Sequence, residues 1–189
     1  MESCITFKNL SIGYRPKHQL RVIASAVSAS LHPGELTCLI GANGVGKSTL
    51  LRTLCGFQPA LDGEILLQDQ PLSAYPAQQL ARQIGVVLTS RIDVPQLSVK
   101  EIVGIGRSPY TNFWGTLTPA DQQIVDEAIH QVGIGHLAQR NISELSDGER
   151  QKTMIAKALA QQTRIIILDE PTAFLDFPSK IETLQMLRR

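Results

Sequence analysis

The sequence lacks the features that would place it in a membrane, on nucleic acid or around a structural metal. No apolar run approaches the roughly 18 residues that cross a bilayer, and the first residues lack the basic start and apolar run of a signal peptide. Net charge is only +1, so no overall field favours nucleic acid or anionic lipid. The three cysteines are scattered, which favours reduced, buried thiols over a metal site. We therefore expect a soluble, cytosolic chain whose membrane role, if any, depends on a partner.

Short apolar segments are present at both ends of the chain. Residues 4–10 and 20–31 alternate apolar and polar side chains, as strands with one exposed face do. Leu36–Ile40 is a nearly continuous apolar run, which predicts a buried parallel strand. Residues 48–55 have leucines at helical spacing, and Gly56 follows where a helix-ending glycine belongs. Further strands are expected at 64–68, 84–88 and 164–168, the last as a buried strand.

The middle of the chain is helical in pattern. Ser98–Glu101 forms a capping-box sequence, and Thr118–Asp121 is a second helix start with proline at the first helical position. A third helix is expected from Ser146 to about Ala160. The pattern predicts one α/β domain over residues 1–189, with a core and β-subdomain at 1–90 and 156–189 and a helical subdomain at 91–155.

A glycine-rich loop lies between the predicted strand at 36–40 and the helix after it. Gly41–Thr49 fits the pattern G-x-x-x-x-G-K-S/T in the strand–loop–helix context that this motif requires. Its glycines let successive backbone N–H groups point inward, and Lys47 adds a full positive charge beside the phosphates. The Ser48 hydroxyl is a hard oxygen ligand suited to Mg²⁺. The residues expected to bind ATP here are Gly41, Asn43, Gly44, Gly46, Lys47, Ser48 and Thr49.

Two acidic residues end the predicted strand at 164–168. Phosphoryl transfer requires a carboxylate near the metal and a group that orients water. Asp169 is expected to hold Mg²⁺ together with Ser48, and Glu170 to act as the general base that polarises the attacking water. An apolar strand that ends in acids is common by itself, so the glycine-rich loop is what favours this interpretation.

A third motif lies between these two. Leu145–Glu149 resembles the signature L-S-G-G-Q of ATP-binding cassette (ABC) proteins, and Gly148 precedes Asp169 by 21 positions, as that family requires. The resemblance covers nearly the whole chain. It implies that Ser146, Gly148 and Glu149 contact ATP bound to a second copy, so that a homodimer encloses two ATP molecules. By position, Pro171–Asp176 resembles the D-loop along the dimer seam, and Tyr14 resembles the aromatic residue that stacks on adenine.

The family resemblance also implies a fold, a group and partners. The fold is a RecA-like P-loop NTPase core sheet with an N-terminal antiparallel β-subdomain and the inserted helical subdomain. Val99–Gly115 is most similar to importers of iron–siderophore, haem or cobalamin complexes. We therefore expect an ATPase on the inner face of the cell membrane, bound to permease subunits and indirectly to a substrate-binding protein, without a nucleic-acid partner. The aromatic residues in Tyr110–Trp114 either pack inside the helical block or help to receive the permease.

Three departures from the family pattern weaken the expectation of turnover. Thr89 stands where the family has the glutamine of the Q-loop, and Asp147 replaces a signature glycine. No histidine follows Asp169, although family members carry a switch histidine further on, so we expect a fragment or truncated chain. The expectation is that these 189 residues bind Mg·ATP but hydrolyse it poorly by themselves.

Other functions remain open at this point. A soluble cassette ATPase acting on ribosomes or DNA usually has two cassettes or long insertions, and neither is present. A small-molecule kinase would leave the signature unexplained. A cassette that binds ATP with little hydrolysis is consistent with Thr89.

Overall fold

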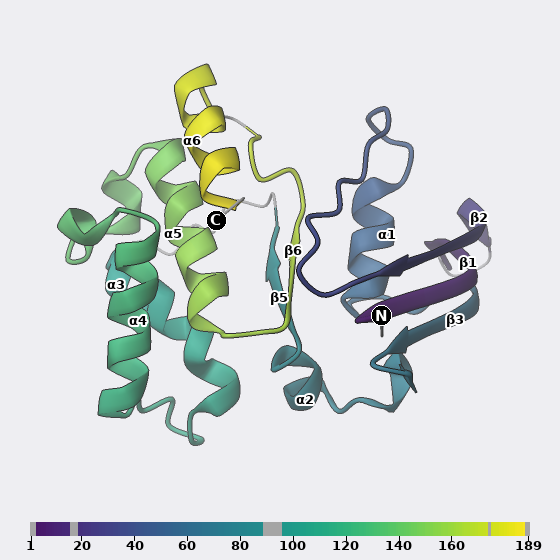
Figure 1. The fold of residues 1–189 in the computed structure, drawn as a ribbon, viewed down its shortest axis with the longest axis horizontal. Coiled ribbons are helices and arrows are strands. Elements are labelled where there is room, and N and C mark those ends of the chain that lie inside the picture. Colours follow the sequence, from purple (N-terminus) through teal and green to yellow (C-terminus); the bar gives the residue numbers. More distant parts are fainter. Residues whose placement is uncertain (1–2, 16–18, 89–95, 174, 188–189) are drawn as a thin grey trace. The chain divides into compact units, whose positions relative to one another are not determined.

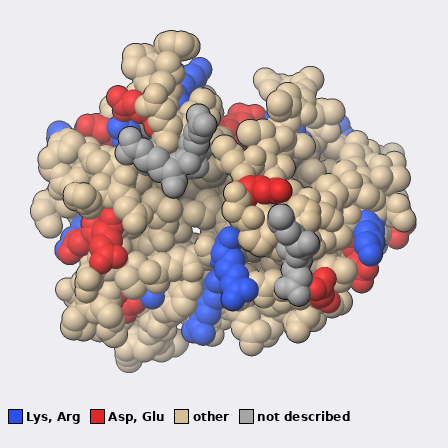
Figure 2. All heavy atoms as spheres, viewed as in Figure 1, with Lys and Arg blue, Asp and Glu red and all other residues tan. Residues whose placement is uncertain are grey.

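The computed structural model describes residues 3–15, 19–88, 96–173 and 175–187. The chain divides into two compact units, Met1–Ala77 and Gln78–Arg189. The sequence predicts a boundary between the core and the helical subdomain at residues 90 and 91, which differs from the boundary between these two units. The predicted subdomain division stays a prediction. None of the helices in the described parts of the chain has the length and apolar character needed to cross a bilayer. On the face shown in Figure 2, acidic and basic side chains are interspersed among uncharged ones.

The first unit contains a four-stranded antiparallel sheet in the order β2-β1-β3-β4 (Figure 1). The strands are β1 (Ile5–Tyr14), β2 (Arg21–Leu31), β3 (Asp62–Leu67) and β4 (Gln70–Pro71). β1 buries Ile5 and Phe7, and then Leu10 and Ile12. The buried positions change from odd to even numbers because the register shifts between Phe7 and Leu10, where Asn9 has a φ of 48°. The predicted pair of N-terminal strands is confirmed.

Helix α1 (Lys47–Leu54) follows the glycine-rich loop and ends as its sequence predicts. Gly56 has a φ of 73°, which glycine adopts without a Cβ clash. The Phe57 N–H donates to the Arg52 carbonyl at 2.9 Å, and the Gly56 N–H donates to the Thr53 carbonyl at 3.1 Å. These two bonds form a Schellman motif and satisfy carbonyls that the helix end would otherwise leave unpaired.

The prediction of a buried strand at Leu36–Ile40 is wrong in this structure. No strand forms there, and the side chains of Leu36, Leu39 and Ile40 are 63%, 47% and 90% exposed. A buried parallel strand needs hydrogen-bonded neighbours and cover on both faces. The sheet of the first unit is antiparallel throughout, so it offers this segment no parallel neighbour.

The second unit combines a parallel strand pair with a block of helices. β5 (Ile84–Val87) and β6 (Ile165–Leu168) pair in parallel from Ile84↔Ile165 to Val87↔Leu168, which confirms these two predicted strands. β6 is less buried than expected, since Ile166 is 36% exposed. The helices are α2 (Ala77–Ala81), α3 (Val99–Gly104), α4 (Pro119–Gln131), α5 (Asp147–Ala160) and α6 (Phe177–Leu187), with 3-10 turns at Ile105–Tyr110, Gly135–Leu137 and Ile142–Glu144. A further 3-10 turn, Leu72–Ala74, belongs to the first unit.

Helices α3, α4 and α5 pack side by side around the core of this unit (Figure 1). Each begins at the helix start expected for it, and each start is a capping box: Ser98 with Glu101, Thr118 with Asp121, and Ser146 with Glu149. Only the first of these boxes was predicted as such. In each box the hydroxyl accepts a backbone N–H and the acid accepts the N-cap N–H, so donors of the first turn are satisfied locally. The core includes Val99, Ile102, Val103, Val125, Ala128, Ile129, Ile155 and Ala156.

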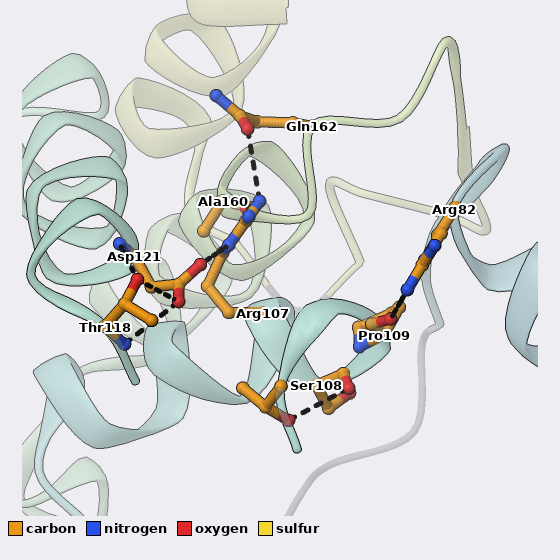
Figure 3. A network of polar contacts seen from close by, with 9 residues as sticks. Arg82, Arg107, Ser108, Pro109, Thr118, Asp121, Ala160 and Gln162 are labelled. Atoms are coloured by element: carbon orange, nitrogen blue, oxygen red, sulfur yellow. Dashed lines mark hydrogen bonds and ion pairs between the residues drawn. The ribbon is translucent and has the colours of Figure 1, made fainter. Parts of the chain in front are cut away.

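A buried arginine ties three segments of this helical block together (Figure 3). The Arg107 Nε donates to the Asp121 carboxylate at 2.9 Å, and its Nη1 donates to the Ala160 carbonyl at 3.0 Å and to the Gln162 side chain at 3.1 Å. Hydrogen bonds from Thr118, and then from Arg107, hold the pKa of Asp121 below its usual value. The Asp121 carboxylate therefore caps helix α4 and pairs with Arg107 at the same time.

The ring of Tyr110 lies between two guanidinium groups next to this network. The Arg107 carbon Cζ lies 4.1 Å from the ring centre and that of Arg82 lies 5.1 Å from it. Arg82 also donates to the Pro109 carbonyl through Nη2 at 2.8 Å (Figure 3). Because Arg82 precedes β5, these contacts connect the start of that strand to the helical block.

We expect Arg107→Ala to lower the melting temperature by roughly 6–15 °C, because it leaves the buried Asp121 carboxylate without its cation. Circular dichroism measures this. The matched control is Lys100→Ala, which removes the exposed pair with Asp126 and should shift the melting temperature by less than about 3 °C. Because folding lowers the pKa of Asp121, its ionised carboxylate stabilises the fold at pH values above the usual aspartate pKa. This stabilisation is lost as the pH falls through the folded-state pKa. Equal decreases in melting temperature for Arg107→Ala and Lys100→Ala would contradict a stabilising role of the buried Arg107–Asp121 pair.

Candidate nucleotide-binding site

The loop before α1 needs glycine at two positions. Gly44 and Gly46 have φ values of 78° and 109°, in the left-handed region that favours glycine. Gly46 also lacks room for a side chain, since an added Cβ would lie 2.4 Å from the Ile23 Cγ2 atom of β2. Gly46 is the N-cap of α1, and its carbonyl accepts the Leu50 N–H at 2.9 Å. The loop thus leads into the helix N-terminus that the motif predicts, and a helix N-terminus favours an anion.

Lys47 folds back over this loop. Its Nζ donates to the Gly41 carbonyl at 2.8 Å and to the Ala42 carbonyl at 3.0 Å. The ammonium group is therefore held at the loop that carries the glycines. A positive charge beside inward-facing N–H groups and a helix N-terminus suits the phosphates of a nucleotide.

A contact that sequence reasoning missed joins the end of β1 to α1. The Tyr14 hydroxyl and the Thr49 Oγ1 atom are 2.9 Å apart. Tyr14 is 42% exposed, so its ring keeps an accessible face. No sequence signal marks this pair, because the two residues lie 35 positions apart. Stacking of Tyr14 on adenine stays a prediction, and unchanged ATP affinity in Tyr14→Ala would count against it.

The acidic pair at the end of β6 lies as a strand end predicts. Asp169 is only 5% exposed, and its N–H donates to the Val87 carbonyl of β5 at 2.9 Å. Glu170 is exposed and has a φ of 50°, which is unusual for a residue with a side chain and costs free energy. Such strain concentrates at functional sites. Ser48 and Asp169 belong to different units, so their joint binding of Mg²⁺ stays a prediction.

The signature segment is shaped by its own hydrogen bonds. The Ser146 hydroxyl and N–H both donate to the Glu149 carboxylate at 2.8 Å, and the Ser146 oxygen accepts the Glu149 N–H at 3.3 Å. These bonds from Ser146 hold the pKa of Glu149 below its usual value. The side chain of Asp147 is exposed, in the first turn of α5. Contact of Ser146, Gly148 and Glu149 with a second copy's ATP stays a prediction.

The aromatic residues after α3 separate into two environments. Tyr110 packs between two arginines, whereas Phe113 and Trp114 are 94% and 83% exposed and meet edge to face with ring centres 5.4 Å apart. The Asn112 side chain accepts the Trp114 N–H at 3.0 Å and thereby shapes the turn that presents them. Tyr110 is therefore packed within the helical block, whereas Phe113 and Trp114 lie on the surface. That these two residues help to receive the permease stays a prediction. Thr89 lies outside the described residues.

Comparison with known proteins identifies the combination of loop, acidic strand end and signature helix. The sequence profile of the ABC transporter family matches residues 24–173, which include all three motifs. The chain belongs to the ABC transporter family. Its fold is the ATP-binding cassette, an α/β P-loop NTPase fold with an antiparallel β-subdomain, as the sequence predicted. The domain of this family binds nucleotide.

Two relatives indicate which members of the family this chain is similar to. An uncharacterized ABC transporter ATP-binding protein of Methanocaldococcus jannaschii is 41% identical over 96% of the chain and 61% of its own length. The achromobactin transport ATP-binding protein CbrD of Dickeya dadantii is 36% identical over 98% of the chain and 68% of its own length. The chain therefore spans between about three fifths and two thirds of the length of these relatives.

Two solved structures are similar over the whole cassette. A transporter described as of the metal-chelate type, in an inward-facing conformation, superposes with a TM-score of 0.83 at 30% identity, covering 100% of this chain and 68% of that one. A dimeric ATP-binding cassette in a post-hydrolysis state with ADP and Pi superposes with a TM-score of 0.82 at 23% identity, covering 97% of this chain and 81% of that one. At that identity the second likeness concerns the fold alone.

Proposed function

We propose that this cassette is the ATP-binding and hydrolysing subunit of an ABC importer for iron–siderophore, haem or cobalamin complexes. The observation that carries the proposal is the P-loop, in which Lys47 lies over the carbonyls of Gly41 and Ala42 at the N-terminus of α1. The relative that transports achromobactin and the metal-chelate type structure support the substrate class. The cassette acts at the inner face of the cell membrane, bound to permease subunits and through them to a substrate-binding protein.

Each residue of the proposed site has its own role in ATP binding and hydrolysis. The glycine N–H groups of the loop and the Lys47 ammonium bind the phosphates. The Ser48 hydroxyl and the Asp169 carboxylate are hard oxygen ligands of the kind Mg²⁺ prefers, and the ion neutralises charge on the phosphates when bound. Glu170, exposed at the end of β6, orients the attacking water and accepts its proton. Tyr14 stacks on the adenine.

Two copies of the cassette enclose two ATP molecules. Helix α5 presents its N-terminus at the signature, and a helix N-terminus favours an anion such as the γ-phosphate bound to the other copy. This arrangement explains why the signature begins a helix. Poor hydrolysis by these 189 residues alone stays a prediction, supported here by Thr89 at the position of the Q-loop glutamine.

Co-purification tests the transport role. We expect the affinity-tagged protein, extracted from membranes of its own organism in mild detergent with Mg·ATP, to recover a multi-helix permease identified by mass spectrometry. Membranes without the tagged protein are the control. Recovery with ribosomes, or recovery without any membrane protein, would contradict the transport role and favour a soluble cassette ATPase.

A further inference from the structure

Helix α6 follows the D-loop directly and lies beside the start of α5 (Figure 1). One close approach is at Gly148, the second glycine position of the signature. A Cβ added there would lie 3.0 Å from the Ser179 Oγ atom and 3.4 Å from its Cβ. The Ser179 side chain therefore lies so close to Gly148 that a Cβ at this position would require it to shift by a few tenths of an ångström.

A second contact joins the same helices one turn further along each. The Lys152 Nζ and the Glu182 Oε2 are 2.7 Å apart, and their side chains are 25% and 59% exposed. Lys152 follows Gly148 by four positions and Glu182 follows Ser179 by three, so the two contacts lie on successive turns. The two helices thus run alongside each other in the same direction over this stretch.

The start of α6 is also attached to the end of the D-loop. The Asp176 carboxylate accepts the Ser179 N–H at 3.1 Å and so caps the helix. Hydrogen bonds from Ser179 hold the pKa of Asp176 below its usual value, so the cap is ionised near neutral pH. Ser179 therefore contacts the D-loop residue Asp176 through its side chain and its backbone N–H, and its side chain also lies against the signature at Gly148.

We propose that Lys152 and Glu182 are positioning residues that lock α6 against α5, so that the signature and the D-loop meet a second copy of the cassette as one preformed surface. The inference rests on the proposed ATP-enclosing dimer. Both segments must fit the second copy at the same time, and a surface that is already ordered loses less conformational freedom on binding. Gly148 and Ser179 set how close the helices come, and the ion pair sets their register.

Charge exchange tests the pair in the full-length protein, with Glu170→Gln present in every sample to suppress hydrolysis. We expect Lys152→Glu and Glu182→Lys each to raise the dissociation constant of the Mg·ATP-dependent dimer by roughly three- to ten-fold. The double variant should restore it to within about two-fold, because the attraction is re-formed with the charges exchanged. Analytical ultracentrifugation measures dimerisation, and titration with a fluorescent ATP analogue checks that ATP binding to the monomer is unchanged.

The matched control is Lys100→Glu, which makes the same change of charge at the α3–α4 pair with Asp126 and should leave dimerisation unchanged. If a reversed variant unfolds, Glu182→Gln replaces it and should weaken the dimer by about two-fold. Single variants that dimerise normally, or a double variant no better than the singles, would overturn the positioning role. Failure of the parent Glu170→Gln protein to dimerise with ATP would instead overturn the proposed dimer itself.

Discussion

Replacing Lys47 by alanine is expected to weaken ATP binding by about 30-fold to 4,000-fold. Truncating one partner of a charge pair that is shielded from water costs roughly 2–5 kcal/mol, and each 1.4 kcal/mol is a factor of ten in affinity. In this cassette the ammonium group already lies at the loop, donating to the Gly41 and Ala42 carbonyls. The Lys47 ammonium group is therefore already held at the loop before ATP binds. Isothermal titration calorimetry with Mg·ATP measures the loss.

The control for this variant is Lys8→Ala, which removes an exposed lysine of β1 in the same unit. It should leave ATP affinity unchanged. Because Lys47 also braces the loop, the melting temperature without nucleotide is measured for both variants. An affinity within about five-fold of the parent in Lys47→Ala, with the fold intact, would refute the phosphate-binding role of this loop.

Replacing Glu170 by glutamine is expected to reduce ATP hydrolysis by the full-length protein by about 10²- to 10⁴-fold while ATP still binds. Glutamine keeps the shape of the side chain and cannot accept the proton of the attacking water. It also removes a negative charge beside the phosphates, so an ATP-bound dimer should accumulate in place of monomers. The strained backbone at this residue, with a φ of 50°, aims an exposed carboxylate from the end of β6.

Phosphate release measures turnover, and size-exclusion chromatography with light scattering measures the dimer. The matched variant is Glu64→Gln, an exposed glutamate of β3, which should leave both unchanged. A Glu170→Gln protein that stays monomeric with Mg·ATP would contradict the ATP-enclosing dimer. Unreduced hydrolysis would contradict the assignment of the general base.

The features that were predicted correctly are those that a short stretch of chain determines by itself. The helix starts at Ser98, Thr118 and Ser146 were predicted, the first as a capping box, and the capping hydrogen bonds join residues only three positions apart. The glycines of the phosphate loop and Gly56 are required by backbone conformation, which is equally local. Glu149 forms the cap with Ser146, a bond that was not predicted, and its contact with the partner's ATP stays a prediction.

The features that could not be predicted depend on residues far apart in the chain. The bond between Tyr14 and Thr49 and the contacts of Arg107 with Asp121 and Gln162 have no local signal. The apolar run at Leu36–Ile40 fails for the same reason. A hydrophobic pattern states that a segment prefers burial, but a strand also needs a neighbour with free hydrogen-bonding groups, and that neighbour comes from elsewhere in the chain.

The sequence by itself therefore determined the family, the phosphate loop, the acidic strand end and the helix that begins at the signature. Each of these is a short motif whose residues act through backbone geometry and charge within a few positions. Only the tertiary structure decided that Lys47 lies over its own loop and that Ser179 covers Gly148. It also decided that Lys152 meets Glu182, because the approach of α6 to α5 depends on packing between helices that 16 residues of strand and loop separate in the chain.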